Sequence, residues 1–412
     1  MLPLLSGLRV LDLTNERGYL CGRMLADLGA DVIKIEPPGG DAGRRIGPFY
    51  HDTPDPQKSL FWFAYNTNKR GATLNLHSAT GRAVFLQMIE DTDIVVESFD
   101  PGYLSELGLG YESLRAVNPA LIMVSITPFG QSGPYANYQS CDLVSMAMGG
   151  FINLCGDSDR PPVAPVAPQA YVNAGADAAA AAMIAYHHRQ ITGEGQQVDV
   201  SIQESVSLAM YLSIPFWELS HFTLKRYGSS RLLGSNVLSR MVWPCKDGHV
   251  CFVIHGGMTG SHTNKSLVNW MAEEGILPDF MKEIVWEKFD LSKVTVDLMD
   301  KLNEYISEFF LKHTTSELYQ WATKNRAMLY PVSTCEDLLA NDQLKDRNFW
   351  VTVDHPELNE TITYPGPWVA SSEIAPSAEA RAPLIGENNQ EIYGELGIKP
   401  DELISLKQSG VI

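Results

Sequence analysis

The chain has 412 residues, 45% of them hydrophobic and 19% charged, which is ordinary for a globular enzyme of two or three domains with an extensive core. Its formal net charge of −18 argues against general nucleic-acid binding, because that function needs a basic surface. The same charge opposes the binding of any polyanionic ligand unless local cations counter it.

The first half of the chain alternates between predicted strands and helices. The strand segments are short apolar runs, and the helical segments carry apolar residues at helical spacing. Strand–helix–strand units of this length connect parallel strands, so we expect a doubly wound α/β domain with a parallel sheet. The predicted elements are a strand at 8–14, a helix at 18–30, a strand at 31–38, a helix at 81–91, and strands at 93–99 and 120–129.

The turn after the first strand, Thr14-Asn15-Glu16-Arg17-Gly18, lacks the GxGxxG pattern of dinucleotide-binding enzymes, so we expect no nicotinamide or flavin cofactor. The six cysteines show no CxxC spacing, so we expect neither a metal site nor a disulfide framework. The first residues, MLPLL, lack the basic flank and long apolar core of a signal peptide, and no apolar run reaches 18 residues. We therefore expect a cytoplasmic protein.

A helix of small residues is predicted from about Ala174 to Gln190, within a stretch that reads NAGADAAAAAMIAYHHRQ. A glycine turn at 193–195 and a strand at 196–202 follow it. Small residues let a helix bring its backbone close to a neighbour or to a ligand. The candidate chemistry therefore lies at the start of this helix, where Tyr171 is predicted to sit on a loop.

The chain changes character after Leu224. A hairpin with its turn at Asp247-Gly248 is predicted, followed by a glycine-containing loop and by helices near 265–275 and 295–326. These elements predict a smaller α+β domain over residues 225–325. Residues 330–412 are expected to return to the large α/β domain begun by residues 1–220, and to end in a helix near 389–397.

Eight segments, in order along nearly the whole chain, resemble the class III CoA-transferases of the CaiB/BaiF type. The resemblance implies a large α/β domain built from both termini, a small central domain, and two interlocked subunits. It is greatest to the benzylsuccinate CoA-transferase type. The segments are GLRVLDLT, LADLGADVIKIEPPGGD, NTNKRGATLNL, PGYLSELGLGYESL, NPALIMVSITPFGQSGPY, CDLVSMAMGGFINLCGD, HRQITGEGQQVDVSIQESV and APLIGENNQEIYGELG.

The resemblance implies a catalytic aspartate just before the small-residue helix. In the family, this aspartate attacks an acyl-CoA thioester and later carries CoA as an enzyme-bound thioester. Counted back from the turn at 193–196, the equivalent residue here is Tyr171, a phenol that is mostly neutral at pH 7 because its ordinary pKa is near ~10. Asp177 lies six residues further along the predicted helix, roughly 9 Å away along its axis and on another face. We interpret Asp177 as a first-turn carboxylate placed by the helix dipole, so no catalytic residue is predicted to be intact.

The positions that the resemblance assigns to CoA binding have also lost their positive charge. Lys and Arg are the natural partners of the CoA phosphates. Here Glu106 precedes the Leu-Gly pair where a cation is common, and Asp100 stands where some relatives carry arginine. His77 and Gln139 occupy two further customary cation positions. We predict a degenerate CoA site.

These features together predict the non-catalytic subunit of a heteromeric CoA-transferase. Its partner would be a paralogue that binds the CoA thioester, which is a substrate rather than a cofactor. The expected reaction moves CoA from succinyl-CoA to an acid such as an aryl-substituted succinate. The loop 255–262, with Gly256, Gly257 and Gly260, resembles a glycine-rich loop that covers the reacting carboxylates, so it is predicted to complete the partner's site.

Two alternatives stay open. The chain could be an active homodimeric CoA-transferase that uses Glu16 or Asp177 as a relocated acid, in which case the purified chain alone would turn over. It could also be a pure scaffold, in which case changing Gly256, Gly257 and Gly260 in the assembled complex would leave turnover unchanged.

Overall fold

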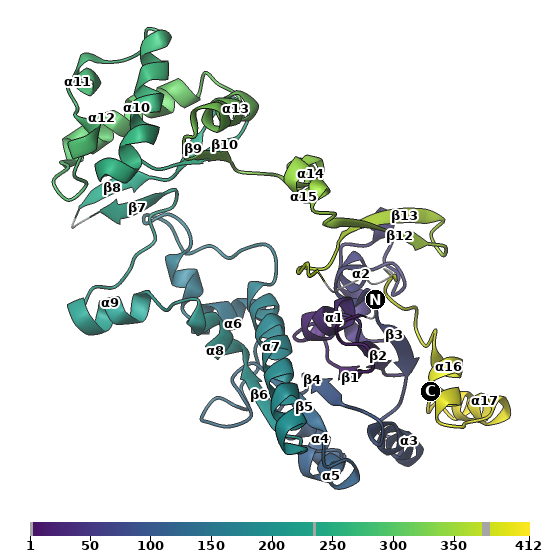
Figure 1. Ribbon diagram of the computed structural model, residues 1–412. Helices are drawn as coiled ribbons and strands as arrows, with labels where there is room; N and C mark the ends of the chain where they lie inside the picture. Colours follow the sequence, from purple (N-terminus) through teal and green to yellow (C-terminus); the bar gives the residue numbers. More distant parts are fainter. Residues whose placement is uncertain (1–2, 234–235, 373–379) are drawn as a thin grey trace. The chain divides into compact units, whose positions relative to one another are not determined.

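The computed structural model describes residues 3–233, 236–372 and 380–412, and its contacts divide the chain into two compact units (Figure 1). The large unit comprises Met1–Phe151, Pro165–Pro215 and Asp342–Ile412. The small unit comprises Ile152–Ala164 and Phe216–Asn341. The chain therefore leaves the large unit in its middle third and returns to it before its C-terminus.

A six-stranded parallel sheet forms the centre of the large unit, which confirms the predicted doubly wound α/β class. The strand order is β3-β2-β1-β4-β5-β6, so the order reverses between β1 and β4. In open sheets of this kind, ligands bind at the carboxyl ends of the strands next to such a reversal. The strands are β1 Arg9–Leu13, β2 Asp31–Glu36, β3 Arg70–Thr73, β4 Ile94–Glu97, β5 Ile122–Thr127 and β6 Gln197–Ser201.

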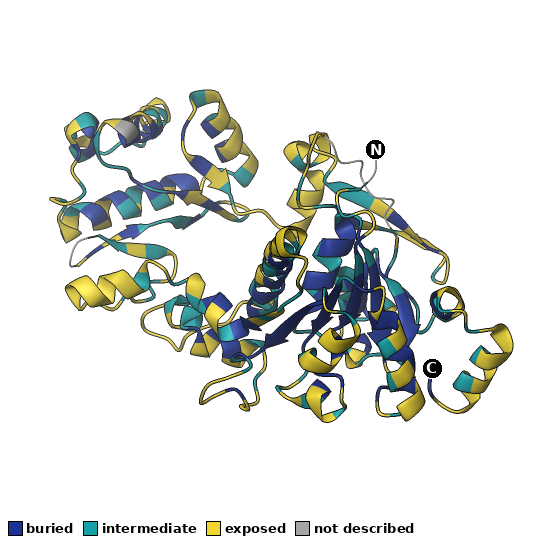
Figure 2. Ribbon diagram, turned by 60° about the horizontal axis from the view of Figure 1, so that its bottom comes forward, coloured by how far each residue is buried: buried dark blue, intermediate teal, exposed yellow. Residues whose placement is uncertain are grey.

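Helices cover both faces of this sheet, and the central strands β1, β4 and β5 are almost entirely buried. Figure 2 shows the strands of the sheet as the most continuously buried part of the large unit. The helices of the N-terminal segment are α1 Tyr19–Asp27, α2 Leu60–Asn66, α3 Ala79–Ile89, α4 Tyr103–Glu106, α5 Tyr111–Val117, α6 Asp142–Met148 and α8 Ile202–Leu208.

The small-residue helix α7 spans Gln169–Thr192 and begins five residues earlier than predicted. A contact between distant segments accounts for the difference, because Asp142 Oδ1 accepts a hydrogen bond of 3.1 Å from the backbone N–H of Tyr171. That bond satisfies one of the donors left unpaired at a helix N-terminus. Along one face of α7 the alanines are buried, and a Cβ at Gly175 would lie 2.9 Å from Leu20 Cβ of α1. The small residues therefore serve close packing between α7 and α1.

The C-terminal segment closes the large unit against its N-terminal part. The hairpin of β12 and β13 packs Val353 and Tyr364 onto Trp62 and Phe63 of α2. Further along, Tyr393 donates a hydrogen bond of 2.6 Å to the carbonyl of Thr73 in β3. The predicted helix near 389–397 is present, and a second helix follows it. These elements are α15 Asp342–Asp346, β12 Trp350–His355, β13 Glu360–Pro365, α16 Asn389–Glu395 and α17 Pro400–Gln408.

The small unit contains the predicted hairpin, in which Cys245 N–H bonds to the carbonyl of Gly248. Trp243, Phe252 and Phe310 meet edge to face at its core, with ring centroids 5.5 to 6.1 Å apart. The elements are β7 Ser230–Leu233, β8 Val237–Arg240, β9 Val242–Pro244, β10 His249–Phe252, α10 Gly257–Glu273, α11 Asp279–Lys282, α12 Val296–Phe310, α13 Thr315–Asn325, β11 Leu329–Pro331 and α14 Cys335–Ala340.

One sequence prediction in the small unit needs correction. The segment 255–262 is mostly helical rather than a loop, because α10 already begins at Gly257. The helical segments predicted near 295–326 are α12 and α13, and Thr314 starts the second of them with a capping box to Glu317. Among the residues that the structure describes, no helix has both the length and the apolar character needed to cross a membrane.

Candidate functional site

Tyr171 lies in the first turn of α7, beside the loop that follows β1. It lines a cavity of about 10 Å³ together with Glu16, Leu20 and Pro168. A space of that size holds about one water molecule. The cavity that Tyr171 lines therefore has space for little more than a water molecule.

The surroundings of Tyr171 keep its phenol protonated. Burial raises its pKa to about 12, the negative charges of Glu16 and Asp142 act in the same direction, and the guanidinium of Arg17 opposes them. A phenol with this pKa is neutral at physiological pH and is a weak nucleophile. The group at the predicted position of catalysis is therefore unsuited to attack a thioester.

Asp177 does not take over that position. It is exposed, and it lies in the third turn of α7 because the helix begins at Gln169. The interpretation of Asp177 as a first-turn carboxylate placed by the helix dipole is wrong, since the effect of the dipole falls off within the first turn. The earlier start of α7 is the reason for this error.

The structure brings two of the predicted degenerate positions together. Gln139 Nε2 lies 3.4 Å from Asp100 Oδ2, and the other carboxylate oxygen of Asp100 lies 3.2 Å from Arg17 Nη1. Arg17 in turn contacts Tyr171, so the four side chains form one connected group. Arg17 lies in the turn after the first predicted strand, but no role was predicted for it from the sequence.

The other two degenerate positions have different neighbours. His77 Nε2 lies 3.0 Å from the hydroxyl of Tyr103. Glu106 is exposed at the end of α4. Their assignment to a lost CoA site stays a prediction from the resemblance.

An acidic pocket of about 480 Å³ is lined by residues at the carboxyl end of β4, at the amino ends of β5 and β6, and in α4 and α5. Glu97, Asp100 and Glu112 line it, and none of its described lining residues is Lys, Arg or His. A ligand rich in phosphate would meet uncompensated repulsion there. Within residues 3–233, 236–372 and 380–412, no three His, Cys, Asp or Glu side chains are grouped so that they could hold a metal ion.

Glu97, at the end of β4, is the buried carboxyl group of this pocket. Burial raises its pKa from an ordinary 4.5 to about 7, and Asp199 adds to the increase, whereas hydrogen bonds from Ser125 and the Phe99 backbone oppose it. The folded pKa exceeds the unfolded one, so the stability that Glu97 contributes is fully present below about pH 4.5 and is lost as the pH rises through about 7.

Replacing Glu97 by glutamine is therefore expected to stabilise the chain by about 1–3 kcal/mol above pH 7 and to have little effect near pH 4.5. Urea unfolding at pH 4.5 and pH 8 measures the difference. The exposed Glu106→Gln variant is the control and should show no such gain. Equal stabilities of the Glu97 variant and the wild type at pH 8 would contradict the raised pKa.

The predicted glycine residues of the small unit lie at the start of α10. Gly256 is the residue that caps the helix, and Gly257 adopts a φ of 69° that favours glycine. Gly260 is buried inside the helix, where an added Cβ would lie 1.9 Å from His255 Cβ. Close packing inside the small unit therefore explains Gly260, and a loop role remains a prediction for Gly256 and Gly257 alone.

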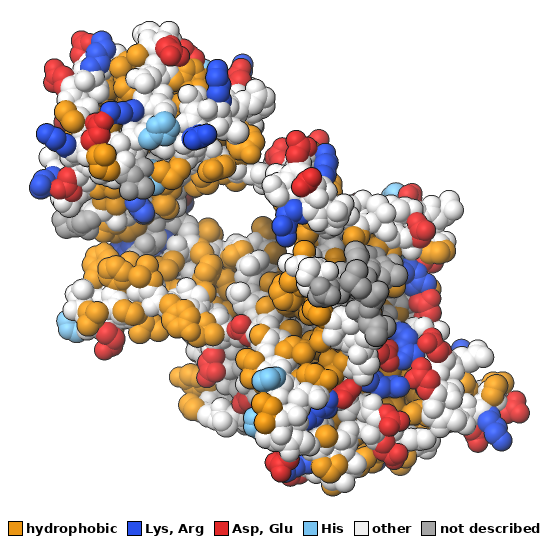
Figure 3. Space-filling view, in the orientation of Figure 1, with side chains coloured by type: hydrophobic (Ala, Val, Ile, Leu, Met, Phe, Trp, Pro, Cys, Tyr) orange, Lys and Arg blue, Asp and Glu red, His pale blue; other side chains and the backbone are white. Residues whose placement is uncertain are grey.

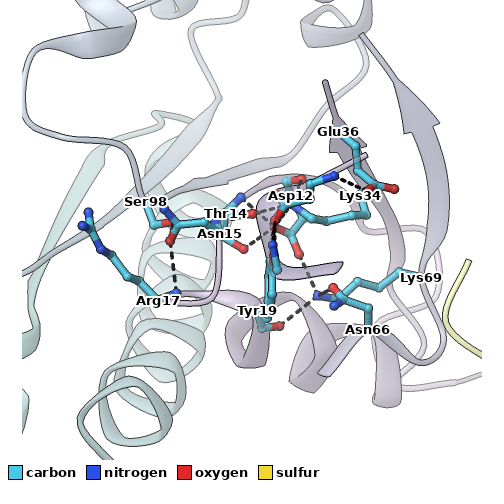
Figure 4. Close-up of polar contacts among 12 residues, drawn as sticks. Asp12, Thr14, Asn15, Arg17, Tyr19, Lys34, Glu36, Asn66, Lys69 and Ser98 are labelled. Carbon is cyan, nitrogen blue, oxygen red and sulfur yellow. Dashed lines mark hydrogen bonds and ion pairs between the residues drawn. The ribbon is translucent and has the colours of Figure 1, made fainter. Parts of the chain in front are cut away.

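A buried ion network lies next to the start of the loop after β1 (Figure 4). It was not predicted from the sequence. Lys69 Nζ lies 2.8 Å from Asp12 Oδ2, and Lys34 Nζ lies 3.7 Å from Asp12 Oδ1, with all three side chains fully buried. Asp12 also accepts hydrogen bonds from the backbone and the hydroxyl of Thr14. The network therefore fixes the point at which the site loop leaves the sheet.

Comparisons with known proteins agree over the whole chain. The sequence model of CoA-transferase family III matches residues 5–389. The succinyl-CoA:(R)-benzylsuccinate CoA-transferase subunit BbsE of Thauera aromatica is 38% identical, covering 99% of this chain and 98% of that protein. The formyl-CoA:oxalate CoA-transferase of Streptomyces coelicolor is 31% identical over 99% of each chain. A crystal structure of a CAIB/BAIF family protein from Brucella suis superposes with a TM-score of 0.83 at 26% identity, covering 96% of this chain and 100% of that one.

Proposed function

The chain belongs to CoA-transferase family III, and from this premise we propose that it is the non-catalytic subunit of a heteromeric CoA-transferase. A paralogous subunit supplies the attacking aspartate and binds the CoA thioester. The donor is succinyl-CoA and the acceptor is an aryl-substituted succinate, because the benzylsuccinate relative carries both in its name and is itself a subunit.

The observation that carries this proposal is the phenol of Tyr171. The reaction begins when a carboxylate oxygen attacks the thioester carbonyl, which releases the CoA thiolate and leaves a mixed anhydride. A half-buried phenol with a pKa of about 12 offers no ionised oxygen at neutral pH, and the cavity that it lines has the volume of about one water molecule. The acidic pocket next to Asp100 adds a second obstacle to CoA in this chain.

The apolar surface of α9 supports the assembly with another subunit. This helix, Ser213–Ser220, has no buried residue, although Phe216 is 40% exposed and Leu219 is 85% exposed. Hydrophobic side chains gather over α8 and α9 in Figure 3. Several large apolar side chains exposed on one short helix mark an interaction surface, so α9 is expected to be covered by the paralogous subunit.

The proposal is tested by comparing the chain purified alone with the chain produced together with its paralogue. We expect no turnover of succinyl-CoA and benzylsuccinate by the chain alone, and full turnover by the copurified complex. Measuring the formation of benzylsuccinyl-CoA by liquid chromatography checks both. Turnover by the chain alone would contradict the proposal.

A relocated acid is the second candidate, and the position of Glu16 is the observation that favours it. Glu16 lines the same small cavity as Tyr171. If the chain alone turns over, Glu16→Gln should abolish that activity. If activity survives this change, Asp177→Asn tests whether Asp177 is the relocated acid instead.

A further inference from the structure

Two loops are joined where the order of the sheet reverses. Leu13 of β1 pairs with Glu97 of β4, and the chain continues beyond both strands. Past this pair, the backbone N–H of Asn15 donates to Ser98 Oγ at 2.8 Å, and Ser98 Oγ lies 2.9 Å from Asn15 Oδ1 (Figure 4). Two residues further along each loop, Arg17 pairs with Asp100. The contacts bridge the place where open α/β sheets bind their ligands.

The ion pair between Arg17 and Asp100 places a mostly buried cation against an exposed anion. The Arg17 side chain is 12% exposed, whereas that of Asp100 is 59% exposed. Arg17 Nε is buried and has no hydrogen-bond partner among the described residues. A guanidinium has five N–H donors in a fork that fits a carboxylate or a phosphate. Arg17 therefore retains the chemistry of an anion-binding group, although its charge is already paired.

Asp100 is held in this position from both sides. Its Oδ1 faces Arg17, and its Oδ2 faces Gln139 Nε2 at 3.4 Å. Its backbone carbonyl separately accepts a hydrogen bond from the N–H of Tyr103. The side chain thus contributes the ionic contact, whereas the backbone alone contributes to the turn into α4.

We propose that Asp100 determines ligand specificity at this edge of the sheet, because its carboxylate occupies the Arg17 guanidinium in place of a ligand anion. The ligand excluded in this way is a carboxylate or a phosphate group. The inference rests on the proposed function, since it explains how a non-catalytic subunit avoids competing with its partner for CoA or for a dicarboxylate.

Competition of this kind has a measurable consequence. A ligand anion must displace Asp100 from Arg17 and then remains close to the displaced negative charge. Neutralising Asp100 removes both the competition and the repulsion. Anion affinity is therefore expected to rise at least about tenfold.

The test is calorimetric titration of the isolated chain with coenzyme A and, separately, with succinate. We expect Asp100→Asn to bind at least one of them at least about tenfold more tightly than the wild type. Tighter binding of coenzyme A would identify phosphate as the excluded group, and tighter binding of succinate would identify carboxylate. Asp91→Asn is the matched control, because it removes one exposed negative charge at the amino end of the same strand, β4. A second exchange, Arg17→Gln, should abolish the gain in the Asp100→Asn background.

Three results would overturn the inference: no gain with either ligand, an equal gain in Asp91→Asn, or a gain that persists without Arg17. Thermal unfolding of each variant shows that it is folded, and Asp100→Ser provides a second neutral replacement. Because the readout is binding by the isolated chain, its failure differs from failure of the proposed function, which is measured as turnover.

Discussion

In the proposed heteromeric enzyme, replacing Tyr171 by phenylalanine is expected to leave turnover within about twofold of wild type. Replacing the attacking carboxylate of the proposed catalytic subunit by alanine is expected to lower turnover by about three orders of magnitude or more. The phenol is protonated and half-buried beside Glu16, so losing its hydroxyl removes no nucleophile. Phenylalanine also conserves the packing of the ring. Steady-state kinetics of the two complexes at saturating succinyl-CoA measure both effects.

The Tyr171→Asp substitution tests whether a carboxylate at position 171 is enough to make the isolated chain active. We expect Tyr171→Asp to leave the isolated chain inactive, because Asp100 still occupies Arg17 and the neighbouring pocket remains acidic. Both variants should be compared at equal thermal stability. A loss of a hundredfold or more in the Tyr171→Phe complex would place the phenol in the reaction and contradict its assignment as inert.

The parallel sheet could be predicted from the sequence because its signals are local. The runs at 8–14 and 31–38 are rich in Val, Ile and Leu, and the helix between them has apolar residues at helical spacing. The start of α7 could not be predicted, since it depends on a hydrogen bond from Tyr171 to Asp142, 29 residues away. The same limit explains the error over Asp177, whose place in the helix follows from where the helix begins.

The candidate site shows the same division between local and distant signals. Tyr171 could be singled out by counting from the glycine turn, and the predicted loss of cations at Asp100 and Gln139 also rests on single positions in the sequence. The pairing of Asp100 with Arg17 joins residues 83 positions apart. The two residues meet because β1 and β4 are adjacent in the sheet. The sequence of one strand does not show which other strand lies next to it.

Breaking the buried ion network is expected to destabilise the fold strongly, so Asp12→Ala should lower the free energy of unfolding by about 3–5 kcal/mol at pH 7. Removing this carboxylate leaves Lys69 and Lys34 buried with no charge to balance them, apart from Asp41 at 3.7 Å from Lys34. Urea unfolding measures the loss. Asp297→Ala is the matched control, because its ion pair with Lys301 spans 2.9 Å but is exposed, so little change is expected.

The pH dependence of the Asp12 effect follows from the direction of its pKa shift. Burial alone would raise the pKa of Asp12, but Lys69 and Lys34 outweigh burial and hold it below its ordinary value of 3.8. A carboxylate with a lowered pKa stabilises the fold above the unfolded value, and that stability is lost as the pH falls through the folded value. The difference between wild type and Asp12→Ala should therefore be constant from pH 5 to 7 and narrow only below about pH 4. A difference below about 1 kcal/mol at pH 7 would mean that water or a rearranged lysine compensates the lost charge.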